Sequence, residues 1–339
     1  MVSVKSYTVI LDRDQTINAD PGYLNDPAKV SLLPRAAEGI RLLNEFGIRV
    51  FVATNQSGVA RGLISAEQLA AVNAKITELL AADGARIEKI YVCPHGDSDN
   101  CDCRKPKPGL IRQIIEEHKL DPAKTFIAGD RARDLICAIP FGMRGILVGA
   151  EETERPENMV FHAANLHEAA SFVLETIFEE ESHTKVFASA EAFLPKLDAE
   201  RKAGKKIVFT NGCFDLLHSG HVQLLAQARA LGDYLIMGLN SDRSVRVLKG
   251  ESRPVNSEQD RARILAQLPY IDAVVIFDED TPVELMQKLA PDIQVKGGDY
   301  VKEKLPEYEV MKKMGKEIVI LPFRKGYSTT GILARSHAK

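Results

Sequence analysis

The 339-residue chain has few cysteines, no long apolar run and no large excess of either charge. Five cysteines in so long a chain do not form a disulfide scaffold. No segment approaches the roughly 20 apolar residues of a membrane span, and the start lacks the apolar core of a secretory signal. Lys and Arg number 44 against 47 Asp and Glu, which argues against general binding to nucleic acid. These absences predict a cytoplasmic protein without membrane or nucleic-acid partners.

The length accommodates two domains, and 45% hydrophobic with 27% charged residues is typical of globular proteins. Up to Glu181 the chain has 20 basic and 27 acidic residues, whereas the remainder has 24 and 20. An acidic run, Glu179–Glu181, precedes this change, although a solvated helix end would also account for it. We expect one domain over residues 1–180, a linker over 181–184 and a second domain over 185–339.

Short apolar segments alternate with helical patterns in both halves, which predicts an α/β fold with two doubly wound parallel sheets, each Rossmann-like. Ligands of such sheets bind beyond the carboxyl ends of the strands. The expected helices of the first half are Ala36–Phe46, Ala66–Ala82, Gly109–His118 and Leu166–Phe178. The expected strands are Tyr7–Asp12, Arg49–Thr54, Arg86–Cys93 and Thr125–Asp130, then Lys206–Thr210, Tyr234–Leu239, Ala273–Phe277, Ile293–Lys296 and Glu317–Leu321.

Two carboxylates, Asp12 and Asp14, follow the first predicted strand. Like charges this close repel unless a cation or proton lies between them, and Mg²⁺ accepts a few carboxylates plus phosphate oxygens. Asp12 can then attack phosphorus, and Asp14 can protonate the leaving oxygen and activate water. A capped strand end is the structural alternative.

Three further segments in chain order complete a phosphoryl-transfer pattern. Thr54–Gly58 follows the second strand and can hold phosphoryl oxygens. Arg104 and Lys105 supply positive charge for a developing negative charge. Asp130 ends the fourth strand and suits a Mg²⁺ ligand, with Asp134 supporting it. Each segment alone could be a turn or a charged surface, but the order of all four favours a catalytic site.

Cys93, His95, Cys101 and Cys103 place three thiols and one imidazole within eleven residues. This set matches tetrahedral Zn²⁺, and four protein ligands indicate a structural site. Buried free cysteines beside a surface histidine are the alternative. Because Arg104 and Lys105 follow directly, the metal would hold them against the phosphate.

About the first 180 residues resemble the D-glycero-D-manno-heptose 1,7-bisphosphate 7-phosphatase branch of the haloacid dehalogenase-like (HAD-like) hydrolases, through Asp12–Thr16, Asp20–Tyr23, Thr54–Gly58, the cysteine segment and Gly129–Asp130. The resemblance implies Asp12 as nucleophile, Asp14 as acid and base, Thr54 and Lys105 as phosphoryl stabilisers, and Mg²⁺ on Asp12, Asp14 and Asp130. It implies sugar-phosphate contacts from Asp20, Gly22, Tyr23, Asn55, Gln56, Ser57, Arg61 and Arg104. Histidinol-phosphate phosphatases share these motifs.

Two positions depart from the pattern of that family, which usually has Gly at Gln15 and Lys at Arg131. If position 15 requires a positive φ, Gln would store roughly 1–3 kcal/mol of strain beside the nucleophile. Arg131 keeps the charge of Lys but not its geometry. We therefore expect an active site that is slow or retuned, with a non-catalytic, zinc-stabilised first domain as the alternative.

In the second half, His218 and His221 stand at the start of a predicted helix, after a strand and Gly212. A helix N-terminus offers unpaired N–H groups to a phosphate, and two histidines three residues apart can both donate to its oxygens. A metal site and ordinary helix capping are the alternatives.

The segment from Gly212 to His221 resembles the HxGH nucleotidyltransferases of the cytidylyltransferase-like superfamily, and from about Lys185 the chain is similar to the adenylyltransferase domain of ADP-heptose synthase. The resemblance implies ATP as co-substrate with Mg²⁺, and His218 and His221 on its α-phosphate. The implied nucleotide-binding residues are Gly212, Cys213, Phe214, Asn240, Asp242, Arg253, Lys296, Gly298, Asp299, Ser328, Thr329 and Thr330.

Together the two resemblances imply consecutive steps towards ADP-heptose, a precursor of the lipopolysaccharide core. The first would remove the 7-phosphate of heptose 1,7-bisphosphate, and the second would join heptose 1-phosphate to AMP from ATP. The expected partners are sugar phosphates and ATP, and a homo-oligomer through the second domain stays open. Other substrates, such as a glycerol phosphate with CTP, are the main alternative. The acidic first half argues against a nucleic-acid-binding module.

Overall fold

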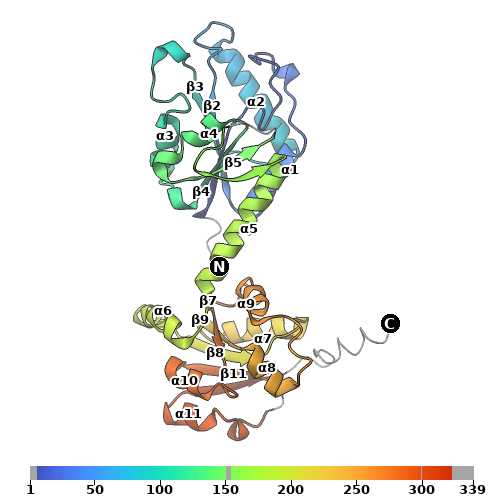
Figure 1. Ribbon diagram of the computed structural model, residues 1–339, viewed down its shortest axis with the longest axis vertical. Coiled ribbons are helices and arrows are strands. Elements are labelled where there is room, and N and C mark those ends of the chain that lie inside the picture. The colour runs from blue at the N-terminus through green and yellow to red at the C-terminus, as the bar shows by residue number, and fades with distance from the viewer. Residues whose placement is uncertain (1–5, 150–153, 299, 323–339) are drawn as a thin grey trace, which may run out of the picture. The chain divides into compact units, whose positions relative to one another are not determined.

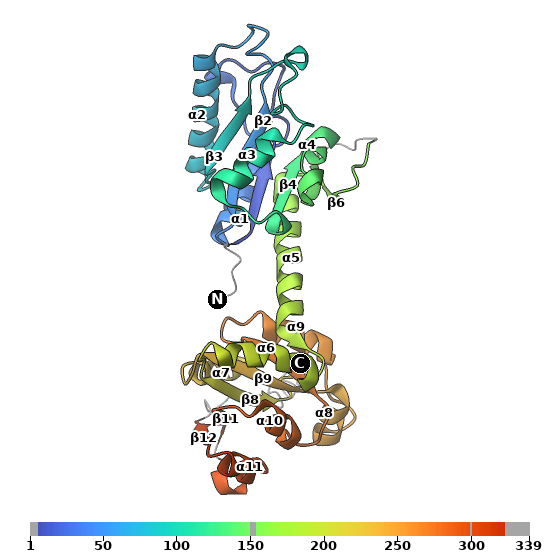
Figure 2. The ribbon, with the colours of Figure 1, turned by 90° about the vertical axis from the view of Figure 1, so that its left-hand side faces the viewer.

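The computed structural model describes residues 6–149, 154–298 and 300–322. The chain forms two compact units, one ending at Ile177 and the other beginning at Phe178. Each unit contains one six-stranded parallel sheet with helices around it (Figures 1 and 2). The expected fold, two doubly wound α/β domains, is confirmed.

The first sheet has the strand order β3-β2-β1-β4-β5-β6, and every neighbouring pair is parallel. The two central strands, β1 and β4, are buried along their whole length, as expected for strands covered on both faces. The strand order reverses between β1 and β4, where ligands of such sheets bind. The strands are β1 (Thr8–Leu11), β2 (Arg49–Asn55), β3 (Lys89–Cys93), β4 (Thr125–Gly129), β5 (Arg144–Val148) and β6 (Met159–Ala163).

The helices of the first unit follow clear local signals. Ser65 begins α2 with a capping box, in which Ser65 and Gln68 each accept a backbone N–H from the other. Residues of α3 share one apolar cluster with β1 and β2, and Figure 1 shows α1 and α2 on the opposite side of the sheet. The helices are α1 (Ala36–Glu45), α2 (Ala66–Ala82), α3 (Gly109–His118), α4 (Ala132–Ile136) and α5 (Leu166–Lys185).

The second sheet has the order β12-β11-β8-β9-β10-β7, and the strand order reverses between β8 and β11, which are parallel. Successive residues of β8 enter different cores, because Ile207 and Phe209 pack with α6 and α10 whereas Val208 packs with α7 and α9. The strands are β7 (Val186–Phe187), β8 (Ile207–Gly212), β9 (Tyr234–Asn240), β10 (Ala273–Phe277), β11 (Ile293–Gly297) and β12 (Glu317–Leu321). The helices are α6 (Ala190–Lys202), α7 (Ser219–Arg229), α8 (Asp242–Lys249), α9 (Glu258–Ala266), α10 (Val283–Leu289) and α11 (Tyr308–Lys313).

Every predicted strand is present within three residues of its expected ends, but β5, β6 and β7 were not predicted. The segment 181–184, expected to be a linker, lies within α5, which continues past Phe178 to Lys185. The domain limits themselves stay a prediction. Among the described residues, no helix combines the length and apolarity that a membrane crossing requires.

Candidate active sites

The first site lies where the first sheet reverses, at the carboxyl ends of β1 and β4. A cavity of about 330 Å³ opens there. It brings together most of the predicted phosphatase residues, although Arg61 and Arg104 do not line it. The lining residues are Asp12, Asp14, Gln15, Asp20, Pro21, Gly22, Tyr23, Thr54, Asn55, Gln56, Ser57, Gly58, Lys105, Asp130, Arg131 and Arg133.

Lys105 is the charged centre of this site. Its Nζ lies 2.5 Å from Oδ1 of Asp12 and 2.7 Å from Oδ1 of Asp134, and all three side chains are buried. Burial raises the pKa of Asp12 to about 7, against the opposing effect of Lys105. Burial alone would lower the pKa of Lys105, but the two carboxylates outweigh it and raise that pKa. Lys105 therefore stays positive and ties Asp12 to the end of β4.

Asp12, Asp130 and Asp134 form the carboxylate cluster of the site, with one oxygen of each within 4.8 Å of the others. Burial, and next the charge of Asp134, raise the pKa of Asp130 to about 6. A divalent cation would relieve this repulsion, and carboxylate oxygens are the donors that Mg²⁺ prefers. The cluster contains Asp134, expected only as support, and not the side chain of Asp14.

Asp14 is instead oriented by hydrogen bonds. The guanidinium of Arg13 donates from Nε to Oδ1 and from Nη2 to Oδ2 of Asp14, each at 2.9 Å. Gln56 donates to Oδ2 at 2.7 Å. Arg13 also donates from Nη1 to Oδ1 of Asn73 on α2 at 2.8 Å, which holds its guanidinium in place. Sequence reasoning missed Arg13 and Asn73. An arginine between two aspartates, directly after a predicted strand, was the available signal.

The loop that carries Lys105 is fixed to the end of β2. Asn55 accepts from the backbone N–H of Lys105 at 3.1 Å and donates to its carbonyl at 3.0 Å. Gln56 also donates to the hydroxyl of Thr54 at 2.9 Å. Asn55 thus holds the cation of the site in addition to any contact with a substrate.

Gln15 has the positive φ on which the expected strain depends, at 57°. Its N–H donates to the carbonyl of Asn18 at 2.8 Å, and its side-chain amide donates to the carbonyl of Asp20 at 2.9 Å. The side chain therefore holds the Asp20–Tyr23 turn through this hydrogen bond. Glycine at position 15 has no side chain and could not do so.

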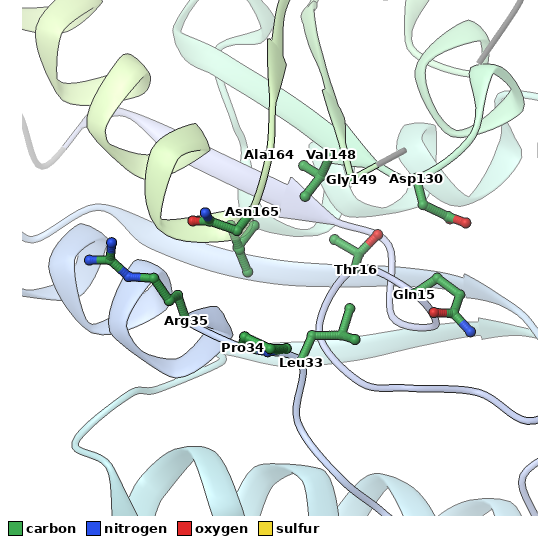
Figure 3. Close-up of a pocket in the computed structure, with 11 residues that line it drawn as sticks. Gln15, Thr16, Leu33, Pro34, Arg35, Asp130, Val148, Gly149, Ala164 and Asn165 are labelled. Carbon is green, nitrogen blue, oxygen red and sulfur yellow. The ribbon is translucent and has the colours of Figure 1, made fainter. Parts of the chain in front are cut away.

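A second cavity, of about 540 Å³, adjoins the first and shares Gln15 and Asp130 with it. Its walls come from the starts of α1 and α5 and the end of β5, with Leu33, Pro34 and Val148 among them (Figure 3). Apolar side chains make up a larger share of this lining than of the first, through Leu33, Pro34, Val148, Ala164 and Leu166.

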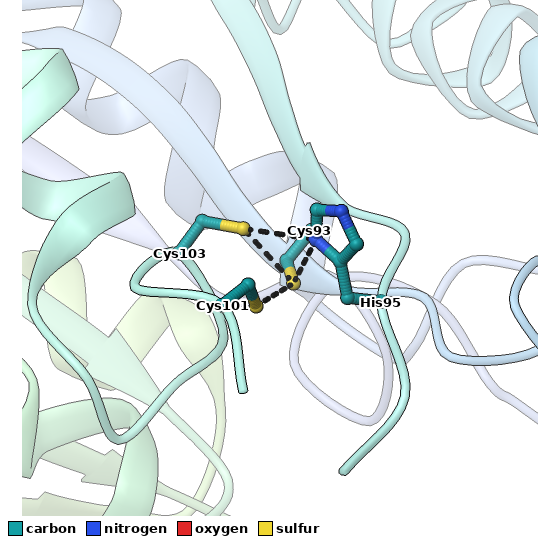
Figure 4. A group of neighbouring side chains, drawn as sticks. All are labelled: Cys93, His95, Cys101 and Cys103. Carbon is teal, nitrogen blue, oxygen red and sulfur yellow. Dashed lines mark hydrogen bonds between the residues drawn. The ribbon is translucent and has the colours of Figure 1, made fainter. Parts of the chain in front are cut away.

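The predicted metal-binding cysteines converge in the loop between β3 and α3 (Figure 4). Sγ of Cys93 lies 3.7 Å from Sγ of Cys101 and 3.3 Å from Sγ of Cys103, and Nδ1 of His95 lies 3.2 Å from Sγ of Cys103. Sulfurs bound to one tetrahedral Zn²⁺ are about 3.8 Å apart. The four side chains are therefore close to the arrangement that a zinc ion requires.

In the second unit, His218 and His221 lie together at the start of α7. Their rings stack with centroids 3.7 Å apart, and Nδ1 of His218 accepts the N–H of His221 as the helix cap. Burial, and next the neighbouring His218, lower the pKa of His221 to about 4; burial also lowers that of His218. Both rings are neutral at pH 7 and can donate hydrogen bonds to a phosphate.

Phe214 packs on this histidine pair, and the loop beside it is fixed by buried charges. The Phe214 and His221 ring centroids are 4.7 Å apart. Asp215 pairs with Arg253 and accepts the N–H of Val255 at 2.7 Å. These contacts join the predicted segments around Phe214 and Arg253.

Arg261 is a second buried residue that sequence reasoning missed. It donates to the carbonyl of Cys213 at 2.6 Å and to Asp242 at 2.7 Å. A polar residue on the inner face of α9 was the only signal. Arg261 connects two of the predicted nucleotide-binding positions.

Lys296 reaches the point where the second sheet reverses. Its Nζ donates to Asn211, at the end of β8, at 2.8 Å and lies 2.6 Å from the buried Glu307. Gly298 is buried after β11, and Asn240 at the end of β9 donates to Ser244 at 2.9 Å. The predicted Asp299 and Ser328–Thr330 lie outside the described residues.

Two family models match the chain. The cytidylyltransferase-like model matches residues 209–335, and the HAD-hydrolase-like model matches residues 102–177. The two matches fall in different units of the fold, as the two resemblances predict.

Curated relatives and solved structures were also found. The chain is 47% identical over 191 residues to the bifunctional protein HldE of Syntrophotalea carbinolica, covering 56% of this chain and 37% of that protein. It is 56% identical over 139 residues to HldE of Pelobacter propionicus, and the match covers 41% of this chain and 28% of that protein. The matched region thus spans about a third of the length of these relatives. The D,D-heptose 1,7-bisphosphate phosphatase from B. bronchiseptica, solved with magnesium and phosphate, is 34% identical with a TM-score of 0.47, covering 50% of this chain and 99% of that one.

Proposed function

Because the chain joins a HAD-hydrolase-like domain to a cytidylyltransferase-like domain, we propose that it is a bifunctional enzyme of ADP-heptose synthesis. The first domain hydrolyses the 7-phosphate of D-glycero-D-manno-heptose 1,7-bisphosphate. The second transfers AMP from ATP to heptose 1-phosphate and releases pyrophosphate. Similarity to curated proteins named bifunctional HldE supports the pairing. The observation that carries the proposal is the presence, in one chain, of the Asp12–Lys105–Asp134 centre and the His218–His221 pair.

In the phosphatase step, Asp12 is the nucleophile. Lys105 contacts its Oδ1, so Oδ2 is the oxygen that attacks phosphorus. The bond between phosphorus and the sugar oxygen breaks, and Asp14 gives that oxygen a proton. Asp14 then takes a proton from water, whose oxygen attacks the aspartyl-phosphate and releases inorganic phosphate. Lys105 stabilises the negative charge on the phosphoryl oxygens.

Two metals belong to this proposal. Asp12, Asp130 and Asp134 would hold Mg²⁺, which supplies neutralisation of phosphate charge when bound. Cys93, His95, Cys101 and Cys103 would hold structural Zn²⁺. Asp14 remains a proposed Mg²⁺ ligand and acid–base residue from the resemblance, and Arg13 and Gln56 orient its carboxylate.

In the adenylyl transfer, an oxygen of heptose 1-phosphate attacks the α-phosphorus of ATP, and pyrophosphate leaves with the electrons of the broken bond. His218 and His221 donate hydrogen bonds to the α-phosphate as charge builds on its oxygens. Lys296, at the carboxyl end of β11, is a further proposed nucleotide-binding residue. Mg²⁺ accompanies the triphosphate as part of the substrate. A cytoplasmic location and a homo-oligomer stay predictions.

The two sites can be separated by substitution. With heptose 1,7-bisphosphate, ATP and Mg²⁺, the wild-type protein should release both phosphate and pyrophosphate. Asp12→Asn should reduce phosphate release at least a thousandfold, because the amide is not a nucleophile. The same variant should still release pyrophosphate from supplied heptose 1-phosphate.

His218→Ala is the matched variant of the second site. It should reduce pyrophosphate release at least a hundredfold, the size of effect that loss of one oxyanion donor has, and leave phosphate release unchanged. If either substitution abolishes both activities in folded protein, the two-site proposal is wrong. Turnover of CTP at the rate of ATP would assign a different nucleotide.

A further inference from the structure

Three cationic side chains line the 330 Å³ cavity: Lys105, Arg131 and Arg133. Two of them have carboxylate partners in the protein. Lys105 bridges Asp12 and Asp134, and Nε of Arg131 lies 3.5 Å from Asp130. Arg133 differs, because among the described residues no acid lies within salt-bridge distance of its guanidinium.

Arg133 also has an unsatisfied donor. Its Nε is buried and has no hydrogen-bond acceptor in the described part of the chain. A buried donor without a partner is unfavourable, and an acceptor oxygen of a ligand would relieve this. Arg133 lies on α4, one residue before Asp134, so the backbone that carries the carboxylate cluster also fixes the start of this side chain. At the edge of the proposed catalytic site, Arg133 is thus a cation without a partner acid in the part of the chain that the structure describes.

Two further arginines near the cavity, Arg104 and Arg61, are already engaged. Arg104 donates to Asp97 at 2.7 Å, and Arg61 lies 3.6 Å from the same carboxylate. Neither lines the cavity. Arg133 contributes only a longer-range attraction to Asp97 and Asp130. Among the described residues that line the cavity, Arg133 is therefore the cation that has no carboxylate partner and keeps a buried donor for a ligand.

We infer that Arg133 binds the second phosphate of the substrate, the one that is not hydrolysed, and so selects a sugar bisphosphate over a monophosphate. This inference rests on the proposed function. A phosphate supplies several acceptor oxygens in the fork geometry that a guanidinium matches. Meanwhile Lys105 and the carboxylate cluster serve the phosphate that reacts. Arg133 is thus a specificity residue and takes no part in the bond changes.

The test compares two substrates in the full-length protein. Heptose 1,7-bisphosphate carries the second phosphate, and heptose 7-phosphate lacks it. Arg133→Gln should raise the KM for the bisphosphate roughly tenfold to a hundredfold, the range for a lost charge-assisted hydrogen bond. It should change kcat less than threefold and leave kcat/KM for the monophosphate unchanged. Arg86→Gln, which removes an exposed arginine paired with Glu88, is the control with no effect on either substrate.

Arg133→Lys keeps the charge without the fork and should retain part of the preference. Circular dichroism verifies that each variant folds. If Arg133→Gln does not fold, the substrate preference of Arg133→Lys tests the inference instead. Equal losses on both substrates, or an unchanged preference, would overturn the inference. Wild-type protein that hydrolyses neither substrate, or the monophosphate equally well, would instead refute the proposed function, and the inference with it.

Discussion

Gln15 combines a strained backbone with a useful side chain. Its φ of 57° is a conformation that costs a residue with a Cβ about 1–2 kcal/mol, whereas its amide braces the carbonyl of Asp20. Gln15→Gly and Gln15→Ala both remove the amide, but only Gly relieves the backbone. We expect the Gly variant to be more stable than the Ala variant by about 1 kcal/mol, the reverse of their order in helices.

Urea unfolding monitored by circular dichroism measures this difference. The KM of the phosphatase reports the role of the side-chain amide. Both variants lose its hydrogen bond to the Asp20–Tyr23 turn, so both should raise KM by a similar factor. An Ala variant as stable as the Gly variant would show that position 15 is not strained. A higher kcat for Gly alone would mean that strain slows the reaction.

At the residue scale, sequence reasoning succeeded where a motif specifies a side chain and was incomplete where the contact is between distant segments. The positions of Asp12 and the histidine pair follow from a strand end and a helix start. By contrast, the approach of Asp134 to Lys105 depends on how α4 leaves β4, one turn after the motif. The link from Arg13 to Asn73 spans 60 positions, and no local pattern contains it.

At the scale of elements, apolar runs predicted most strands, the edge strands β3 and β12 included, whereas β5, β6 and β7 were missed. β6 pairs only with β5, across an irregular register, and is largely half-exposed. β7 has two residues, too few for any periodicity. The charged run Glu179–Glu181 indicated a linker, but Glu favours helix and neither Gly nor Pro interrupts the segment, so α5 continues.

The loop between β3 and α3 links metal binding to catalysis. Cys103 is two residues before Lys105, and Lys105 is fixed to Asn55 through its backbone. Removing zinc should let the loop open and displace Lys105. We therefore expect Cys101→Ser, which removes one ligand, to lower phosphate release at least tenfold and to leave pyrophosphate release from heptose 1-phosphate unchanged.

Chelation provides an independent measurement of the same link. EDTA followed by excess Mg²⁺ should leave phosphate release low, and added Zn²⁺ should restore it in the wild-type protein. Metal analysis should find about one zinc per chain, and less in Cys101→Ser. Full recovery with Mg²⁺ alone would show that these four side chains do not support the phosphatase site.

At the scale of the whole molecule, α5 contributes to both units. Leu166, Val173 and Ile177 are buried on its first part. Its last turns are tied to the second unit, where Gln267 donates to the carbonyl of Phe178 at 3.0 Å and to Ser182 at 2.6 Å, and Lys185 donates to the carbonyl of Ala266 at 3.0 Å. The boundary between the units therefore falls inside a helix. A fragment of the second unit should begin before these residues so that it keeps the hydrogen bonds.

We expect fragment 1–177 to release phosphate and fragment 178–339 to release pyrophosphate, each within about threefold of the full chain, since each keeps its own sheet and core. Fragment 186–339 lacks the last turns of α5. It loses four hydrogen bonds to the rest of the second unit, the fourth being from Lys196 to the carbonyl of Thr184. At about 1 kcal/mol each, their loss should make it less stable than fragment 178–339 by roughly 2–4 kcal/mol in urea unfolding. Equal stability of the two would mean that the end of α5 adds nothing to the second unit. Inactive but folded fragments would mean that each site needs the other half of the chain.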